Sequence, residues 1–365
     1  MSRPRNKRDH FTACLLAGAI GDALGAPVEF LSRAAILSTW GGAGITGFAS
    51  AYGRIGAITD DTQMTLFTAE GLLRGFVRQR MRGICSPVGM VGAAYQRWLV
   101  TQGASNPALS RESNATGWLI GLEALHSRRA PGTTCLSALR AAASYGAVAD
   151  NDSKGCGGVM RVAPVGLMMW RFGNDMNQAF DLACEVCALT HGHPTGQLTG
   201  GVLAAMVHGL LDDASLRDAL DGALAILVTR ARHEETSNAL TLARSLADDG
   251  VDPVQAIARL GQGWIAEEAL AISVYCALVA TNLRHGLVIA VNHDGDSDST
   301  GAITGNLLGA RDGMAAVPQD LIEALELHDA IVEVAHDLHD SADWDIGEYS
   351  QSDLNAIVWK KYPGG

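Results

Sequence analysis

The segment from Val291 to Ala310, VNHDGDSDSTGAITGNLLGA, constrains the fold most, because it joins clustered charge to a helix of small residues. Asp294, Asp296 and Asp298 stand at alternate positions, and the helix is predicted to begin near Ser299. The apolar run before them is typical of buried sequence. Burying a carboxylate without a partner is costly. The pattern therefore predicts a bound cation, and oxygen donors from Asp, Ser and Thr favour Mg²⁺ or Mn²⁺.

Two simpler interpretations of these aspartates were weighed. Capping of a helix by an accepting side chain explains one aspartate but not three. An EF-hand calcium loop fits the spacing of the aspartates, but it requires Gly at its sixth position and Glu at its twelfth. The chain has Ser299 and Gly305 there, so the calcium loop is rejected.

The composition favours one large helical domain. Of the 365 residues, 48% are hydrophobic and only 18% are charged, which is ample for a sizeable core. Aromatic residues make up 5%, whereas glycine and alanine are plentiful, and small side chains allow helices to pack closely. We expect a single, predominantly helical domain over residues 10–365.

Charge and cysteine content limit the partners and the compartment. The net charge of −12 argues against nucleic acid as a partner. The basic residues within 1–9 are too few to reverse this, and we expect that stretch to be a disordered tail. No signal peptide or membrane span is predicted. Seven cysteines, an odd number, indicate reduced thiols and a cytoplasmic protein rather than a disulfide frame.

The first predicted helix carries isolated charge. Apolar residues alternate with Gly and Ala at helical spacing from Phe11 to Phe30, and Pro27 closes the helix. Asp22 interrupts the helix, and Glu29 follows its end. From this stretch alone, such a charge is equally consistent with a solvated helix end and with part of a site.

A second acidic cluster lies between Ile58 and Gly75. Thr59 is predicted to cap a helix from Asp60 to Leu73, with Asp60 and Asp61 in its first turn. Acidic residues are stabilised there by the helix dipole. Two carboxylates beside a hydroxyl also form a compact set of oxygen donors. Together with the later cluster, they would supply enough ligands for two hard cations.

A glycine-rich stretch, SKGCGGVMRVAP, runs from Ser153 to Pro164. Glycine permits backbone conformations that expose consecutive amides to an anion, as in phosphate-binding loops. A simple tight turn is the alternative, because glycine clusters commonly mark turns. No GK[ST] follows, so a Walker motif is excluded.

Two further motifs are weaker. GAGITG, from Gly42 to Gly47, fits the dinucleotide fingerprint, but it lacks the flanking strand and helix that give the fingerprint meaning. His191 and His193 form an HxH pair before Pro194, with no cysteine partner for zinc. We expect a hydrogen-bonding histidine at a pocket wall rather than a zinc ligand. Further helices are predicted at 115–127 and 132–145.

Taken together, these segments resemble the ADP-ribosylglycohydrolase family, which includes the dinitrogenase-reductase-activating glycohydrolase and the ADP-ribosylarginine hydrolases. The resemblance runs in family order over about Phe11 to Gly313. The matching pieces are LAGAIGDALGAPVEF, GAITDDTQMTL, GCGGVMRVAPVG, LTHGHPTG, GWIAEEALAISVYC and NHDGDSDSTGAITGNLLGA. The order of TDDT and DGDSDSTG is highly specific.

The resemblance implies an all-α fold with two magnesium or manganese ions in a central cleft. The implied metal ligands are Thr59, Asp60, Asp61, Asp296, Asp298 and Ser299. Glu29 and Asp61 are the implied catalytic carboxylates. The implied substrate-binding residues are Gly155, Cys156, Gly157, Gly158, Val159 and Met160, which would receive the diphosphate, and His191 in the cleft wall. A further carboxylate of some relatives has only Glu112 as a nearby counterpart.

The resemblance also implies an activity. We expect hydrolysis of the N-glycosidic bond between ADP-ribose and a protein side chain, with arginine favoured by the DGDSDSTG ending. The substrate partner would be an ADP-ribosylated protein. An alternative from another class is an immunity or regulatory protein that binds and occludes an ADP-ribosyltransferase toxin, for which the tail at 1–9 is the visible candidate. A catalytically inactive relative is a third alternative.

Overall fold

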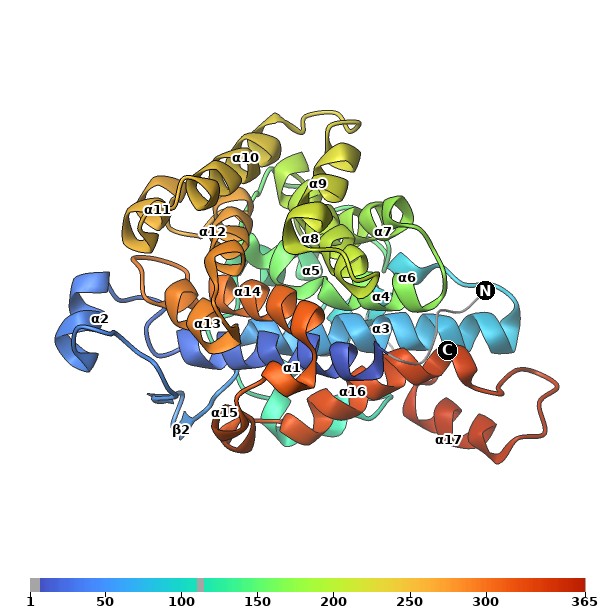
Figure 1. The fold of residues 1–365 in the computed structure, drawn as a ribbon. Coiled ribbons are helices and arrows are strands. Elements are labelled where there is room, and N and C mark those ends of the chain that lie inside the picture. The colour runs from blue at the N-terminus through green and yellow to red at the C-terminus, as the bar shows by residue number, and fades with distance from the viewer. Residues whose placement is uncertain (1–6, 110–114, 365) are drawn as a thin grey trace.

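The computed structural model describes residues 7–109 and 115–364, and it is built almost entirely of helices. Three helices occupy its centre: α1 (Arg8–Gly25), α3 (Asp60–Arg82) and α14 (Ser297–Asp312). In Figure 1, α1 and α3 run across the molecule, and α14 lies against α1. The only strands in the described part are β1 (Ser50–Ala51) and β2 (Arg54–Ile55), which form a short antiparallel hairpin. The all-α prediction is confirmed.

The other helices surround this centre (Figure 1), and most of them contribute to one main core. They are α2 (Arg33–Trp40), α4 (Pro87–Thr101), α5 (Thr133–Ala141), α6 (Ala163–Arg171), α7 (Met176–Ala188), α8 (Pro194–Leu211), α9 (Leu216–Leu227), α10 (Glu234–Asp248), α11 (Pro253–Leu260), α12 (Ala266–Val279), α13 (Leu283–Val291), α15 (Gln319–Ala324), α16 (His328–Asp340) and α17 (Asp353–Lys361). Short 3₁₀ segments are η3 (Leu119–Gly121), η4 (Glu123–Leu125), η5 (Cys156–Arg161), η6 (Met314–Ala316) and η7 (Ser341–Asp343). A second, smaller apolar cluster includes Ala243, Ile257, Ile272 and Ala290.

Glycines bring α1 and α14 into backbone contact. A Cβ atom at Gly21 would lie 2.0 Å from the carbonyl oxygen of Gly301, and one at Gly305 would lie 2.0 Å from that of Ala17. A Cβ at Gly25 would lie 2.4 Å from the backbone nitrogen of Asp298. The small residues of both segments thus have a steric function, which is to place the start of α14 against the end of α1.

The starts of α3 and α14 follow the predicted capping chemistry. Thr59 caps α3, because its hydroxyl accepts a hydrogen bond from the Asp61 amide at 3.3 Å. Asp296 caps α14 by accepting from the Ser299 amide at 3.3 Å. Helix α3 extends to Arg82, beyond the predicted end at Leu73, and stops at Gly83, whose φ of +71° is left-handed. Both acidic segments are therefore helix N-termini.

Two helix predictions differ from the structure. Residues 119–125 form the 3₁₀ segments η3 and η4 instead of an amphipathic helix. Gly117 has a φ of +98°, which is incompatible with an α-helix, so the chain turns there. Helix α5 is shorter than the predicted 132–145 segment, because Ala142 adopts an extended conformation. The β1–β2 hairpin lies in the segment that follows the GAGITG motif.

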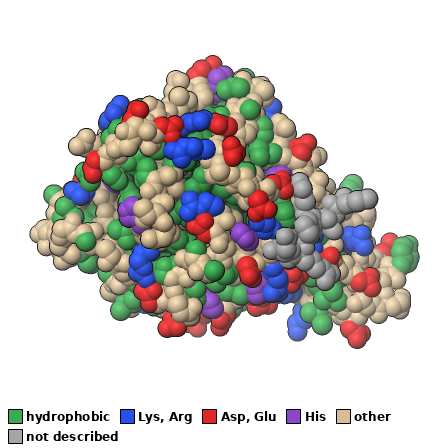
Figure 2. All heavy atoms as spheres, viewed as in Figure 1, with side chains coloured by type: hydrophobic (Ala, Val, Ile, Leu, Met, Phe, Trp, Pro, Cys, Tyr) green, Lys and Arg blue, Asp and Glu red, His purple; other side chains and the backbone are tan. Residues whose placement is uncertain are grey.

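The N-terminal basic stretch is only partly described. Residues 1–6 of the expected tail, and Glu112, lie outside the described residues. Lys7 pairs with Asp213, and Arg8 begins α1 and pairs with Asp340 at 2.7 Å. The described part of the chain contains no helix with both the length and the apolarity to span a bilayer. On the face in Figure 2, acidic and basic side chains are interspersed, with no continuous basic stripe.

Candidate active site

The two acidic segments, some 230 residues apart in sequence, line one pocket of about 400 Å³. Asp60 and Asp61 come from the start of α3, and Asp296 and Asp298 from the start of α14. Glu29, in the turn after α1, adds a fifth carboxyl group. The other lining residues are Phe30, Ala130, Pro131, Gly132, Thr133, Thr134, Cys135, Gly155, Cys156, Gly157, Met160, His191, Trp264 and Ser299.

The α3 carboxylates have little compensation for their burial. Asp60 accepts one hydrogen bond, from the Gly132 amide at 3.3 Å. Asp61 Oδ2 lies 3.5 Å from the Thr59 hydroxyl, whereas Oδ1 is buried without a hydrogen-bond partner. Burial raises the pKa of both carboxyl groups well above the ordinary range, and the negative charge of Asp298 raises it further. Among the residues that the structure describes, neither group has a cationic partner.

The α14 side chains face them across the pocket. Asp298 accepts from the Ser299 amide at 2.9 Å, and its pKa is raised by burial. Asp296 Oδ2 accepts from the Cys156 thiol at 2.8 Å, and its pKa is raised by burial and then by the charge of Asp298. The Ser299 hydroxyl lies 3.8 Å from Cys156 Sγ. Among the pocket carboxylates, Asp298 is thus the one whose charge raises the pKa values of the others most.

The pKa of Glu29 is also strongly raised by this environment. Its Oε2 atom is buried and has no hydrogen-bond partner. Burial, followed by the charges of Asp298 and Asp296, raises its pKa from the ordinary 4.5 to about 11. A carboxyl group of this kind stays protonated until positive charge enters the pocket.

Asp22 supports the site from behind, a role that sequence reasoning left undecided. It is fully buried in α1 and accepts from the Thr59 amide at 3.0 Å and the Thr62 amide at 3.1 Å. The Thr62 hydroxyl also contacts it. These bonds fix the first turn of α3 and so orient Asp60 and Asp61. The signal was present in the sequence as the single acid within an apolar helix.

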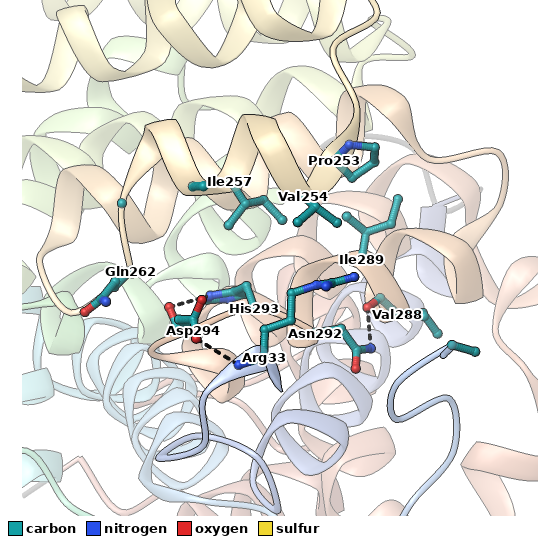
Figure 3. Close-up of a pocket in the computed structure, with 13 residues that line it drawn as sticks. Arg33, Pro253, Val254, Ile257, Gln262, Val288, Ile289, Asn292, His293 and Asp294 are labelled. Atoms are coloured by element: carbon teal, nitrogen blue, oxygen red, sulfur yellow. Dashed lines mark hydrogen bonds between the residues drawn. The ribbon is translucent and has the colours of Figure 1, made fainter. Parts of the chain in front are cut away.

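Asp294 does not join the other aspartates. Its Oδ1 atom accepts from the Arg33 amide at 2.8 Å and thereby caps α2 (Figure 3). It lines a second pocket, of about 370 Å³, whose walls include Ile257 and Ile289. The expectation that all three aspartates cluster is therefore corrected. The turn at Gly295, where φ is +134°, directs Asp294 and Asp296 to different sides.

The glycine-rich stretch contributes only part of its length to the pocket. Gly155, Cys156, Gly157 and Met160 line it, whereas Gly158 and Val159 are buried outside its wall. None of the three glycines has a positive φ, so unusual backbone conformation is not their function. A Cβ at Gly157 would lie 2.9 Å from Cys135 Sγ and 3.3 Å from a ring carbon of His191. Close packing explains that glycine.

The two histidines of the HxH motif diverge, as predicted. His191 lines the pocket, and its Nδ1 atom lies 2.8 Å from the Thr190 hydroxyl. Burial and the nearby Arg161 lower the pKa of His191 to about 3, so the ring is neutral. His193 instead caps α8 by accepting from the Thr195 amide at 3.2 Å. The pair does not form a zinc site.

The oxygen donors of the pocket are of the kind that binds a hard cation, although they are not already arranged around a single metal position. Carboxylate and hydroxyl oxygens are the ligands that Mg²⁺ and Mn²⁺ prefer. Two buried oxygens, Asp61 Oδ1 and Glu29 Oε2, lack any partner. Within the described residues, no three His, Cys, Asp or Glu side chains converge closely enough to hold a metal as they stand. Binding would therefore draw these side chains together.

The raised pKa values predict how the metal-free protein responds to pH. Burial and the Asp298 charge raise the pKa of Asp22 from 3.8 to about 7, so the folded state binds a proton that the unfolded state releases. Stability from this group is present below its ordinary pKa and is lost as pH rises through about 7. With chelator present, the Tm of the wild type should fall more between about pH 5 and about pH 8 than that of Asp22→Asn. Identical slopes for the two proteins would contradict the prediction.

The fold and the pocket define a class of protein: a helical protein whose buried carboxylates gather where helix N-termini meet. Comparison with known proteins agrees. The family model for ADP-ribosylglycohydrolase matches residues 3–346, and the chain belongs to that family. The recognition made from the sequence motifs is confirmed. As a member, the protein is a glycosylhydrolase that acts on ADP-ribosylated proteins.

Individual relatives are distant but cover nearly the whole chain. An uncharacterised protein of Archaeoglobus fulgidus is 26% identical over 91% of this chain and 96% of its own length. The ADP-ribosyl-[dinitrogen reductase] glycohydrolase of Rhodospirillum rubrum is 26% identical over 87% of this chain and 91% of its own. A solved structure titled ADP-ribosylglycohydrolase-related protein complex has a TM-score of 0.65 at 24% identity, covering 92% and 99% of the two chains. That likeness supports the shared fold.

Proposed function

We propose that the protein hydrolyses the N-glycosidic bond between C1 of the distal ribose of ADP-ribose and the guanidinium of a modified arginine, with two Mg²⁺ or Mn²⁺ ions bound. The convergence of five carboxyl groups on one pocket carries the proposal. The DGDSDSTG ending, which resembles the arginine-directed branch, favours arginine. A relative named as a glycohydrolase for ADP-ribosylated dinitrogen reductase supports a protein substrate.

The proposed chemistry matches this charge. Cleavage of a glycosidic bond develops positive charge on the ribose in an oxocarbenium-like transition state. The ions would neutralise the aspartates, orient the ribose hydroxyls and activate a water molecule. Asp60, Asp61, Asp296 and Asp298 would hold the ions, with Thr59 and Ser299 as hydroxyl donors.

Two carboxyl oxygens are free to move protons. Asp61 Oδ1 and Glu29 Oε2 have no hydrogen bond in the structure, so either can accept a proton from the attacking water or return one to the leaving nitrogen. Glu29 is the stronger candidate for the general acid, because it is not among the carboxylates assigned to the ions, whereas Asp61 is. Asp22 holds α3 in place but touches no part of the pocket lining.

The start of α5 suits the diphosphate. Helix α5 begins at Thr133, and Gly132, Thr133 and Thr134 line the pocket. Its N-cap residue, Gly132, offers no capping side chain. The N-terminus of a helix attracts anions through its free amides and its dipole. Gly155 and Gly157 also line the pocket, so the diphosphate would lie along these backbone amides.

The proposal is tested with purified protein and an arginine-ADP-ribosylated substrate. Released ADP-ribose is measured with Mg²⁺, with Mn²⁺ and with excess chelator, for the wild type and Asp60→Ala. We expect the wild type to release ADP-ribose with Mg²⁺ or Mn²⁺. Release should fall about a hundred-fold or more for the wild type in chelator and for Asp60→Ala with metal. No release by the wild type would overturn the activity. Equal release with chelator would overturn the role of metal.

A further inference from the structure

An exposed aromatic pair stands at the mouth of the pocket. Phe30, directly after Glu29, is 71% exposed, and Trp264 is 39% exposed. Their rings stack with centroids 5.9 Å apart and planes inclined by 16°. Both residues line the pocket. Two large rings left exposed beside a cluster of carboxylates indicate a surface that is covered in use.

The pair is held in place by the site itself. The Trp264 carbonyl accepts from the Cys156 amide at 3.3 Å, which ties it to the glycine-rich stretch. The amide of Gly263, whose φ is +87°, donates to Glu268 at 3.2 Å. Phe30 lies in the turn closed by the hydrogen bond from the Leu31 amide to the Val28 carbonyl at 2.9 Å. The ring positions are therefore fixed relative to Glu29 and Asp296.

The substrate proposed above would place two of its parts in this pocket, the glycosidic bond and the diphosphate. The bond to be cleaved must lie near the carboxylates, and the diphosphate is assigned to the wall at Thr133. The leaving group is attached to a whole protein, so its chain must leave through the mouth. It must therefore pass the rim next to Glu29, where Phe30 and Trp264 stand.

We propose that Phe30 and Trp264 form a platform on which the guanidinium and methylene stem of the modified arginine stack, and that this contact selects arginine linkages over serine linkages. The inference rests on the proposed function. A guanidinium is planar and cationic, so it is attracted to aromatic faces as well as to nearby carboxylates. A serine linkage offers the rings neither charge nor a plane. The platform thus discriminates by the chemistry of the leaving group.

The experiment compares three ligands in the metal-loaded enzyme. Steady-state kinetics are measured with ADP-ribosyl-arginine and with an ADP-ribosyl-serine peptide, and free ADP-ribose is measured as a competitive inhibitor. The variants are Phe30→Ala, Trp264→Ala and their double mutant, with Phe30→Tyr as the conservative replacement. Tyr349→Ala is the matched control, because Tyr349 is 85% exposed and precedes α17, at the end of the molecule opposite α2 in Figure 1.

For the double mutant we expect the KM for ADP-ribosyl-arginine to rise about ten-fold, as for the loss of one partly desolvated cation–π contact with the outer face of the stacked pair. Its kcat, its inhibition by ADP-ribose and its kinetics on the serine peptide should stay within about two-fold of the wild type. Phe30→Tyr and Tyr349→Ala should match the wild type.

Each other outcome overturns the inference in a recognisable way. An equal loss of ADP-ribose inhibition would assign the rings to adenine instead. If the double mutant is active and its KM for ADP-ribosyl-arginine is unchanged, the platform is contradicted but the proposed activity is not. Activity of the wild type on serine linkages only would overturn both the arginine proposal and the platform. A Tm shift in the double mutant, absent in Phe30→Tyr, would reveal a structural role.

Discussion

Replacing Asp298 by asparagine should lower kcat/KM for ADP-ribosyl-arginine by about 10² to 10⁴, whereas it should stabilise the metal-free fold. Burial is the largest cause of the raised pKa values of Asp60, Asp61 and Asp296, and the charge of Asp298 is the next largest. Asparagine has the same shape and can still accept from the Ser299 amide, so the change removes charge and one anionic oxygen. The two effects have one cause. The concentrated negative charge that destabilises the metal-free protein by repulsion is the same charge that attracts a cation.

The stability part is measured by thermal unfolding with and without metal. In chelator, Asp298→Asn should unfold at a higher temperature than the wild type, with a gain on the order of 1 kcal/mol from relieved repulsion. Added Mg²⁺ should raise the Tm of the wild type and leave that of the variant nearly unchanged. A lower Tm for the variant in chelator would show that Asp298 stabilises the fold rather than a ligand.

Asp294→Asn is the matched control for activity. Asp294 has the same chemistry and lies four residues earlier, on the loop before α14, but it accepts from the first amide of α2 and faces the second pocket (Figure 3). Asparagine caps helices as well as aspartate does. We expect its kcat/KM to stay within about two-fold of the wild type. A large loss would mean that the whole loop, rather than the pocket-facing carboxylates, governs activity.

The positions of the candidate site residues could be predicted from the sequence where residue type and helix capping determine them. Residue type predicts that two segments lie at helix starts: Thr59 to Asp61, and Asp296 to Asp298. Carboxylates this dense in core-like sequence also predict a shared cavity or a shared cationic partner. The helical class followed from the small residues and from the period of the apolar ones. These are local properties, so they can be read without knowing what packs against what.

What could not be predicted depends on contacts between distant segments. Asp22 looked ambiguous because its partners, Thr59 and Thr62, belong to another helix. Asp294 looked like a ligand because only the turn at Gly295 separates its direction from that of Asp296. Phe30 and Trp264 stack across 234 residues of sequence, and nothing local in either segment indicates the other.

Replacing Gly305 by alanine should destabilise the protein by about 3 kcal/mol or more, although the same change normally favours a helix by about 1 kcal/mol. The new Cβ would lie 2.0 Å from the Ala17 carbonyl oxygen and 2.8 Å from the Gly18 nitrogen. Backbone atoms of α1 cannot move aside singly, so the two helices must separate along their contact. Since α14 begins with the pocket carboxylates and α1 ends just before Glu29, activity should fall together with the Tm.

The control for this prediction is the same substitution where there is room. Gly222 lies in α9, and a Cβ there would meet only the flexible end of Met176, at 3.3 and 3.4 Å. Gly222→Ala should therefore leave the Tm unchanged or raise it, with wild-type activity. If both alanine variants unfold at the same temperature, close contact between α1 and α14 does not determine stability. If Gly305→Ala loses stability but keeps full activity, the positions of the carboxylates do not depend on that contact.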